Sequence, residues 1–331
     1  MRDLSIIIPA RNEMWLSRTV QDILENSEAD TEVVVLLDGQ EADPPLPTDT
    51  RVSSIYVNKS VGQRGGANLA ADVSSGKYIM KVDAHCSFEK GFDRKMLEMF
   101  KEVGDDVTAV PIMRNLHVFD WACYHNYCGW SQYQGPTPTV CPNCGKSDKL
   151  RRRMKWIGKK RPQSVSFTFD SEPHFQYFND YTGRQEYKDM RDNHGYTESM
   201  SLQGSCFMLS REKYFTLNIC DENLGNWGNQ GIEVACKTWL SGGRVLVNHN
   251  TWYAHLFRTQ GGDFGFPYPL GGRDSQKTKE NVKNVFWKDG FKGQIHPVSW
   301  LLEKFWPITD KGHELWTQED LAMLKQTEFK P

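Results

Sequence analysis

Apolar runs alternate with amphipathic stretches through the first hundred residues of the chain. Nearly continuous apolar runs are typical of strands buried on both faces, and apolar residues three or four positions apart are typical of helices. The pattern predicts strands over residues 4–8, 31–37 and 78–82, and helices over residues 15–24 and 65–73, with a packing helix later at 298–306. This alternation predicts an α/β fold whose central sheet is mostly parallel.

Length and composition narrow the class of protein. The chain has 331 residues, of which 38% are hydrophobic and 25% charged, which excludes a disordered chain and favours a large globular fold with insertions. The longest apolar runs, residues 6–8 and 33–37, are far shorter than the roughly 20 residues that span a bilayer, so we expect no membrane segment. The N-terminal residues lack the pattern of a secretory signal, and we therefore expect a cytoplasmic protein.

Asp83 and His85 directly follow the predicted strand 78–82. Ligands of open α/β sheets bind at this end of the strands. Residues i and i+2 of an extended segment point to the same side, so this carboxylate and imidazole can bind one divalent cation. The spacing alone equally fits a turn in which Asp83 caps the backbone and His85 is merely exposed.

Several segments resemble, in the same order along the chain, the polypeptide N-acetylgalactosaminyltransferases, a family of GT-A glycosyltransferases. The Asp-x-His form distinguishes that family from generic family-2 enzymes, which usually carry Asp-x-Asp. The matching segments are residues 5–13, 34–39, 76–86, 204–207, 221, 227–233, 239–243 and 255–258. The resemblance covers most of the chain and implies a GT-A (Rossmann-like) fold. It also implies a metal-dependent transfer of a sugar from UDP-GalNAc, UDP-GlcNAc or UDP-Glc to an acceptor hydroxyl.

The resemblance assigns roles to the matching positions. The Mn²⁺ ligands of the family correspond to Asp83, His85 and His255, with Mg²⁺ as the alternative ion. Such an ion bridges the two phosphates and neutralises the charge that grows on the leaving UDP. The residues expected to bind the nucleotide and diphosphate are Pro9, Arg11, Glu13, Asp38, Arg64, Asn68, Lys81, Asp83 and Arg258. Without the resemblance, His255 also fits a buried, hydrogen-bonded histidine and Asp38 a simple turn.

Arg64 and Asn68 lie in a glycine-rich stretch that opens a predicted helix. Free N–H groups at a helix start bind anions, so we expect this stretch to face the diphosphate. Glycine-rich helix starts are otherwise common and unspecific.

Residues 227–233 depart from the family pattern, Trp-Gly-Gly-Glu-Asn. Gln230 and Gly231 stand where inverting family-2 enzymes place a Glu-Asp pair that supplies the base, and Glu233 is the nearest carboxylate left for that role. A retaining, front-face mechanism needs no base because the leaving phosphate takes the proton, so we expect retention. Trp227 either forms a wall of the sugar or acceptor subsite or belongs to the core.

The middle of the chain has no counterpart in that family. Cys141 and Cys144 form a Cys-x-x-Cys motif that is typical of zinc ribbons, and Cys123 and Cys128 provide a second pair at nearly ribbon spacing. His125 is an alternative fourth ligand. The sequence therefore predicts a structural Zn²⁺ site, with free buried thiols or a redox pair as the alternatives.

The stretch 146–161 holds nine Lys or Arg residues against one Asp, with Trp156 among them. Cations interleaved with aromatic residues favour binding of a phosphate backbone, although a solvated hairpin also fits. The acceptor predicted on this basis is a hydroxymethylated DNA base, with a protein or glycan hydroxyl as the other options. The competing hypothesis is a non-catalytic nucleic-acid-binding module on a degenerate transferase fold.

These patterns divide the chain into four parts. The predicted boundaries are 1–114 for the nucleotide-sugar half, 115–161 for the zinc-ribbon-like insertion, 162–272 for the acceptor half and 273–331 for a helical extension. Residues 261–268 combine glycines with aromatic side chains, which fits either a lid over the donor or a static loop.

Overall fold

The structure is a computed structural model that describes residues 2–258, 260–326 and 329. The helices are α1 (Leu16–Asn26), α2 (Gly62–Val73), α3 (Phe92–Val103), α4 (Gln185–His194), α5 (Arg211–Thr216), α6 (Gln230–Leu240), α7 (Gly272–Phe286), α8 (Val298–Phe305) and α9 (Gln318–Lys325). Short 3₁₀ helices are η1 (Asp180–Gly183), η2 (Glu222–Leu224) and η3 (Gly262–Phe264). The strands are β1 (Leu4–Ala10), β2 (Thr31–Asp38), β3 (Val52–Val57), β4 (Tyr78–Val82), β5 (Cys86–Phe88), β6 (Val107–Cys123), β7 (Ser131–Tyr133), β8 (Leu150–Ser164), β9 (Phe167–Phe169), β10 (Phe175–Tyr177), β11 (Tyr196–Glu198), β12 (Cys206–Ser210), β13 (Arg244–His255), β14 (Thr309–Asp310) and β15 (His313–Glu314).

The central sheet is mixed and mostly parallel, which confirms the predicted fold class. Its main strand order is β11-β13-β6-β12-β4-β1-β2-β3. Strands β3, β2, β1 and β4 are mutually parallel, as are β6 and β13, whereas β12 runs antiparallel to both of its neighbours. The predicted strands and helices all exist, and their ends differ from the prediction by at most three residues. Strand β3 was not predicted, because it is a half-exposed edge strand and lacks a continuous apolar run.

Alternate residues of the central strands belong to two hydrophobic clusters, one on each face of the sheet. In β1, Ile7 belongs to one cluster while Ile6 and Ile8 belong to the other. Helix α2 packs on the Ile7 side, where a Cβ added to Gly66 would lie 2.7 Å from Leu36 Cδ2. Close packing of α2 on the sheet therefore favours glycine at this position, because a larger residue would displace the Leu36 side chain.

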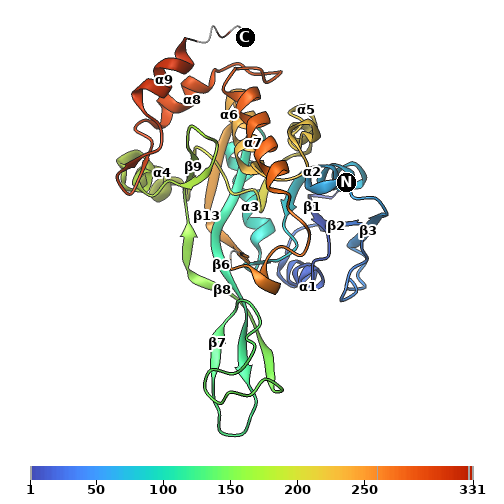
Figure 1. Cartoon of the computed structure of the whole chain (residues 1–331). Helices are drawn as coiled ribbons and strands as arrows, with labels where there is room; N and C mark the ends of the chain where they lie inside the picture. Colours follow the sequence, from blue (N-terminus) through green and yellow to red (C-terminus); the bar gives the residue numbers. More distant parts are fainter. Residues whose placement is uncertain (1, 259, 327–328, 330–331) are drawn as a thin grey trace.

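Strands β6 and β8 form a long hairpin that projects from the body of the molecule, with β7 along its side (Figure 1). We call residues 116–158 the arm. The predicted boundaries 114/115 and 161/162 fall inside β6 and β8, so the arm is a continuation of strands that begin in the central sheet. At its base, Trp156 Nε1 donates a hydrogen bond to Asp22 Oδ2 (2.8 Å), and Trp15 stacks on Phe119.

The C-terminal helices complete the larger of the two hydrophobic clusters. Val282 and Phe286 of α7 and Leu301 of α8 are fully buried in it, which confirms that residues 298–306 form a packing helix. Within the described ranges, no helix is both long and apolar enough to cross a membrane.

Candidate active site

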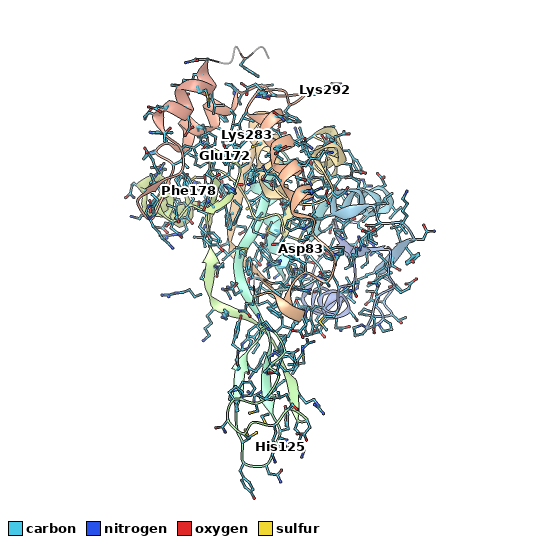
Figure 2. All side chains as sticks on the ribbon, viewed as in Figure 1. Asp83, His125, Glu172, Phe178, Lys283 and Lys292 are labelled. Carbon is cyan, nitrogen blue, oxygen red and sulfur yellow. The ribbon has the colours of Figure 1, made fainter. Side chains whose placement is uncertain are left out.

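Asp83, His85 and His255 meet where strands β4, β5 and β13 adjoin. Asp83 follows β4, His85 precedes β5, and the antiparallel pairing of β13 with β5 aligns His255 with Cys86. His85 Nε2 lies 3.0 Å from His255 Nε2, which lies 3.4 Å from Asp83 Oδ2. Potential ligand atoms of the three residues all lie within 4.8 Å of one another. Figure 2 labels Asp83 in the body of the molecule.

The electrostatics of this trio favour a bound cation. Burial alone would raise the pKa of the Asp83 carboxyl, but the adjacent Lys81 ammonium and the two imidazoles outweigh it and hold that pKa well below its usual range. Burial lowers the pKa of His255 to about 4, so its imidazole is neutral at pH 7. A carboxylate and a neutral imidazole are the protonation states that ligate metals.

The donor set fits an ion such as Mn²⁺. The two Nε2 atoms face each other, while both Nδ1 atoms are buried without a hydrogen-bond partner among the described residues. Neighbouring ligands of an octahedral ion at about 2.1 Å lie about 3.0 Å apart, which matches the separation of the two nitrogens. Mixed imidazole and carboxylate ligands suit a borderline divalent ion better than Mg²⁺.

A cavity of about 450 Å³ opens beside the trio. The predicted site residues in its lining are Pro9, Arg11, Glu13, Asp38, Asp83, His85, Trp227, His255 and Arg258. These residues come from the ends of β1, β2, β4 and β13 and from the loop before α6, and the fold brings all of them to one cavity. Its volume is in the range of a small-molecule site.

Charged side chains are paired along the wall of this cavity, which we call the donor cavity. Arg258 Nη2 donates to Glu13 Oε2 at 2.7 Å, and both side chains are almost fully buried. Asp38 accepts hydrogen bonds from Ser60 Oγ and from the backbone N–H of Val61, each at 2.8 Å. Asp38 therefore fixes the loop that leads into α2, in addition to lining the cavity.

Three predicted nucleotide-binding residues lie outside the cavity lining. Arg64 is fully buried and donates to Glu233 Oε2 (2.8 Å) and to the carbonyls of Gly225 (2.9 Å) and Gly228 (2.7 Å). The structure thus corrects the expectation that Arg64 faces the diphosphate, since its guanidinium holds the loop that carries Trp227. The glycines that suggested an anion site instead let α2 pack against the sheet.

Asn68 and Lys81 are also absent from the cavity lining. Asn68 Nδ2 donates to the carbonyl of Cys220 at 2.9 Å. Lys81 is fully buried, and its ammonium contacts Asp83 and donates to the Gly204 carbonyl at 2.9 Å. Through these contacts, Lys81 orients the carboxylate of Asp83.

Glu233 is not available as a catalytic base. Its side chain has no exposed surface, and one carboxylate oxygen accepts from Arg64. The other accepts from the N–H of Asp221 and from Lys237 Nζ, each at 2.8 Å. The carboxylate is thus held by two cations and a backbone N–H, away from both cavities, and it supports the fold, which corrects the expectation drawn from the sequence.

A second cavity, of about 500 Å³, lies on the other side of Asp83. We call it the acceptor cavity. It shares Asp83, Gln203, Trp227, Gln63 and Ser275 with the donor cavity, so the two spaces meet at Asp83, whereas His85 and His255 line the donor cavity. Gln230 also lines it, and Asp83 is the only carboxylate among its described lining residues. Trp227 therefore lies between the two cavities rather than in the core.

Several lining residues were not predicted as site residues. Phe266 and Tyr268 line the donor cavity from the loop after η3, and Phe266 packs edge-on against Trp227 at 5.6 Å between ring centroids. They belong to the glycine- and aromatic-rich stretch, so composition alone pointed to them. His174 and Lys279 line the acceptor cavity, and no sequence pattern marks them.

The cysteines of the arm converge, whereas the histidine near them does not. Cys123, Cys128, Cys141 and Cys144 bring their sulfurs within 4.8 Å of one another. His125 Nε2 instead lies 2.7 Å from Asp148 Oδ1.

Comparisons with known proteins agree with this geometry. Residues 5–127 match the model of the "Glycosyl transferase family 2" domain. Polypeptide N-acetylgalactosaminyltransferase 3 of Homo sapiens is 24% identical over 305 residues, and the match covers 87% of this chain and 41% of that protein. Its namesake in Taeniopygia guttata is 24% identical over 304 residues, covering 87% and 42%. The chain spans about half the length of the curated relatives it matches, or less.

A solved structure shares the fold. "Crystal structure of GalNAc-T7 with UDP, GalNAc and Mn2+" superposes with a TM-score of 0.60 at 18% sequence identity, covering 87% of this chain and 50% of that one. At this identity the similarity establishes a common architecture.

Proposed function

We propose that this chain, which has the GT-A fold and carries a glycosyltransferase family 2 domain over residues 5–127, transfers a sugar from a UDP-sugar to an acceptor hydroxyl. The observation that carries the proposal is the convergence of Asp83, His85 and His255 in one cavity, which meets a second cavity at Asp83. One cavity then receives the donor and the other the acceptor, with the reacting atoms at their junction.

The donor cavity offers complementary groups for each part of a UDP-sugar. Arg11 and Arg258 supply positive charge for the diphosphate, and the carboxylate of Asp38 can accept hydrogen bonds from uracil or ribose. Mn²⁺ held by the trio would neutralise the charge that grows on the diphosphate as the sugar–phosphate bond breaks. Phe266 and Tyr268 exclude water from one side of the cavity.

UDP-GalNAc is the first donor to test, with UDP-GlcNAc and UDP-Glc next. The proteins to which this chain is similar are named N-acetylgalactosaminyltransferases, and the superposed structure holds UDP, GalNAc and Mn²⁺. Trp227, which lines both cavities, is placed to contact the sugar.

Retention of the anomeric configuration agrees best with the residues that line the acceptor cavity. An inverting displacement needs a base on the acceptor side. Glu233 is buried in ion pairs with Arg64 and Lys237, and the described lining of the acceptor cavity holds no carboxylate except Asp83. In the retaining route the bond between the anomeric carbon and the phosphate oxygen breaks, and the acceptor oxygen bonds to the same face. The acceptor proton then passes to the leaving diphosphate.

The arm and its continuation favour a nucleic acid as the acceptor. Among the described residues, Lys160 and Arg161 have no carboxylate within 4.0 Å, and both are exposed. Next to them, Gln163 Nε2 donates to Tyr177 Oη (3.0 Å), and Tyr177 packs against Phe175, which lines the acceptor cavity. Exposed cations followed by the half-buried ring of Tyr177 and the exposed ring of Phe175 form a path on which phosphates and bases can bind.

Release of UDP from a panel of UDP-sugars, with and without Mn²⁺, tests the proposal. We expect slow Mn²⁺-dependent release from one sugar, faster release on adding a hydroxymethylcytosine oligonucleotide, and a product with the donor's anomeric configuration by NMR. Faster release with peptides but not with the oligonucleotide would overturn the nucleic-acid acceptor alone. An absence of release and of UDP binding with any metal would favour a non-catalytic binding module instead.

A further inference from the structure

The far end of the arm brings four thiols into one cluster, remote from the candidate active site. Figure 2 labels His125 at this end of the arm and Asp83 in the body of the molecule. Cys123 Sγ lies 3.7 Å from Cys144 Sγ, and Cys128 Sγ lies 3.5 Å from Cys141 Sγ. All four sulfurs lie within 4.8 Å of one another.

These separations fit a tetrahedral metal site. Sulfurs bound to zinc at about 2.3 Å in a tetrahedron lie about 3.8 Å apart, close to both measured distances. A disulfide would bring two sulfurs to about 2.05 Å and would leave the pairs as separate bridges rather than one cluster.

Two turns aim the sulfurs at a common point. In one turn, Gly145 N–H donates to the Cys141 carbonyl and Cys141 N–H donates to the Lys146 carbonyl, each at 2.8 Å. Gly145 adopts a φ of +72°, which favours glycine. In the other turn, Cys128 N–H donates to the His125 carbonyl at 3.1 Å. Each turn thus presents thiols in the manner of a zinc knuckle.

The end of the arm lacks a hydrophobic core of its own. The buried members of its cluster are Cys123, Cys141 and Leu150, with Cys128, Trp130 and Cys144 partly buried around them. A unit this small buries too little apolar surface to offset the conformational entropy that it loses on folding. It therefore requires a metal or disulfide cross-link.

We infer that Cys123, Cys128, Cys141 and Cys144 bind one structural zinc ion, which cross-links the two ends of the loop that closes the arm. His125 is excluded as a ligand by its contact with Asp148, which turns it away from the sulfurs. All four positions of the tetrahedron are occupied by protein ligands, so the ion has no open site for catalysis.

Zinc content of the purified chain, prepared under reducing conditions, tests this inference. We expect one zinc per chain in the wild type, in His125→Ala and in Asp83→Asn, because neither change touches the four thiols. Cys144→Ser should lose zinc, and Cys144→His should retain it, since Cys₃His is an equally good structural site. The Cys144→His variant keeps the test decisive if Cys144→Ser does not fold.

Three results would overturn the inference. The first is a wild-type chain that contains no zinc. The second is a wild-type chain whose mass is lower by four hydrogens, as two disulfides would make it. The third is loss of zinc from His125→Ala. The measurement is independent of the proposed sugar transfer, because it reads metal content and not UDP release.

Discussion

His85 Nε2 lies 3.0 Å from His255 Nε2, although the two residues are 170 positions apart in the chain. The pairing of β5 with β13 creates this contact, because it aligns His255 with the residue that follows His85. The register of β13, fixed by this short ladder and by its longer pairing with β6, therefore sets the candidate metal site. A one-residue slip of that ladder would turn His255 to the opposite face.

Glu233→Gln tests whether this carboxylate supports the fold or the chemistry. The change leaves Arg64 and Lys237 as buried cations without a counter-charge, so we expect the free energy of unfolding to fall by about 3–5 kcal/mol. Denaturant titration measures this, with Glu280→Gln on the exposed face of α7 as the control. If Glu233→Gln had normal stability and only a lower kcat, Glu233 would be the base.

Arg258→Ala removes a buried cation that faces the diphosphate in the proposed complex. We expect the Kd for UDP with Mn²⁺ to rise about 10- to 100-fold, the effect of losing one hydrogen bond to a charged group. The same change leaves Glu13 without its arginine partner, so the double variant Glu13→Gln/Arg258→Ala should recover part of the affinity. Calorimetric titration with UDP checks both, and an unchanged Kd in Arg258→Ala would remove this residue from the binding site.

Asp22 makes the stability of the arm's base depend on pH. Burial raises the pKa of its carboxyl to about 6, although Phe88 N–H and Trp156 donate hydrogen bonds to it. The folded protein therefore holds a proton that the unfolded chain releases near pH 4. This contribution is fully present below pH 4 and is lost as the pH rises through 6, about 3 kcal/mol in total.

Asp22→Asn should remove that pH-dependent contribution. We expect the difference in unfolding free energy between pH 4 and pH 7 to shift by about 3 kcal/mol relative to the wild type. Denaturant unfolding at both pH values measures this difference, and identical profiles for the two proteins would contradict the assignment.

The exposed cations at the foot of the arm should contribute to DNA binding. Charge reversal in Lys160→Glu/Arg161→Glu is expected to weaken binding of a labelled hydroxymethylcytosine oligonucleotide and to lower the salt slope by about 2. Fluorescence anisotropy at several salt concentrations measures both. Lys90→Glu/Lys101→Glu, outside the arm, is the matched control and should bind normally. Equal losses in both variants would indicate non-specific attraction alone.

The sequence predicted the elements that rest on local signals. Apolar runs identified β1, β2 and β4, and the Asp-x-His spacing together with a family resemblance identified the metal trio before any geometry was known. Four cysteines in two close pairs likewise identified the cluster in the arm.

What the sequence could not show were contacts between distant segments. Arg64 and Glu233 were both predicted as site residues, and each carries a charge that suits such a role, but they neutralise each other in the interior. His174 and Lys279 come from a loop and a helix that lie about a hundred residues apart in the chain and are brought together by tertiary packing. Which charged side chains are buried, and which ion pairs they form, depends on tertiary packing, and the spacing of residues along the chain does not reveal it.

The most direct test of the proposed function is the Mn²⁺ dependence of UDP release in wild type and in His255→Ala. His313→Ala, an exposed histidine far along the chain, is the control. The account predicts that wild type and His313→Ala release UDP only when Mn²⁺ is present. It also predicts that His255→Ala, with unchanged thermal unfolding, loses at least about tenfold in rate at the same Mn²⁺ concentration. A folded His255→Ala variant that keeps the wild-type rate and the wild-type Mn²⁺ dependence would contradict it.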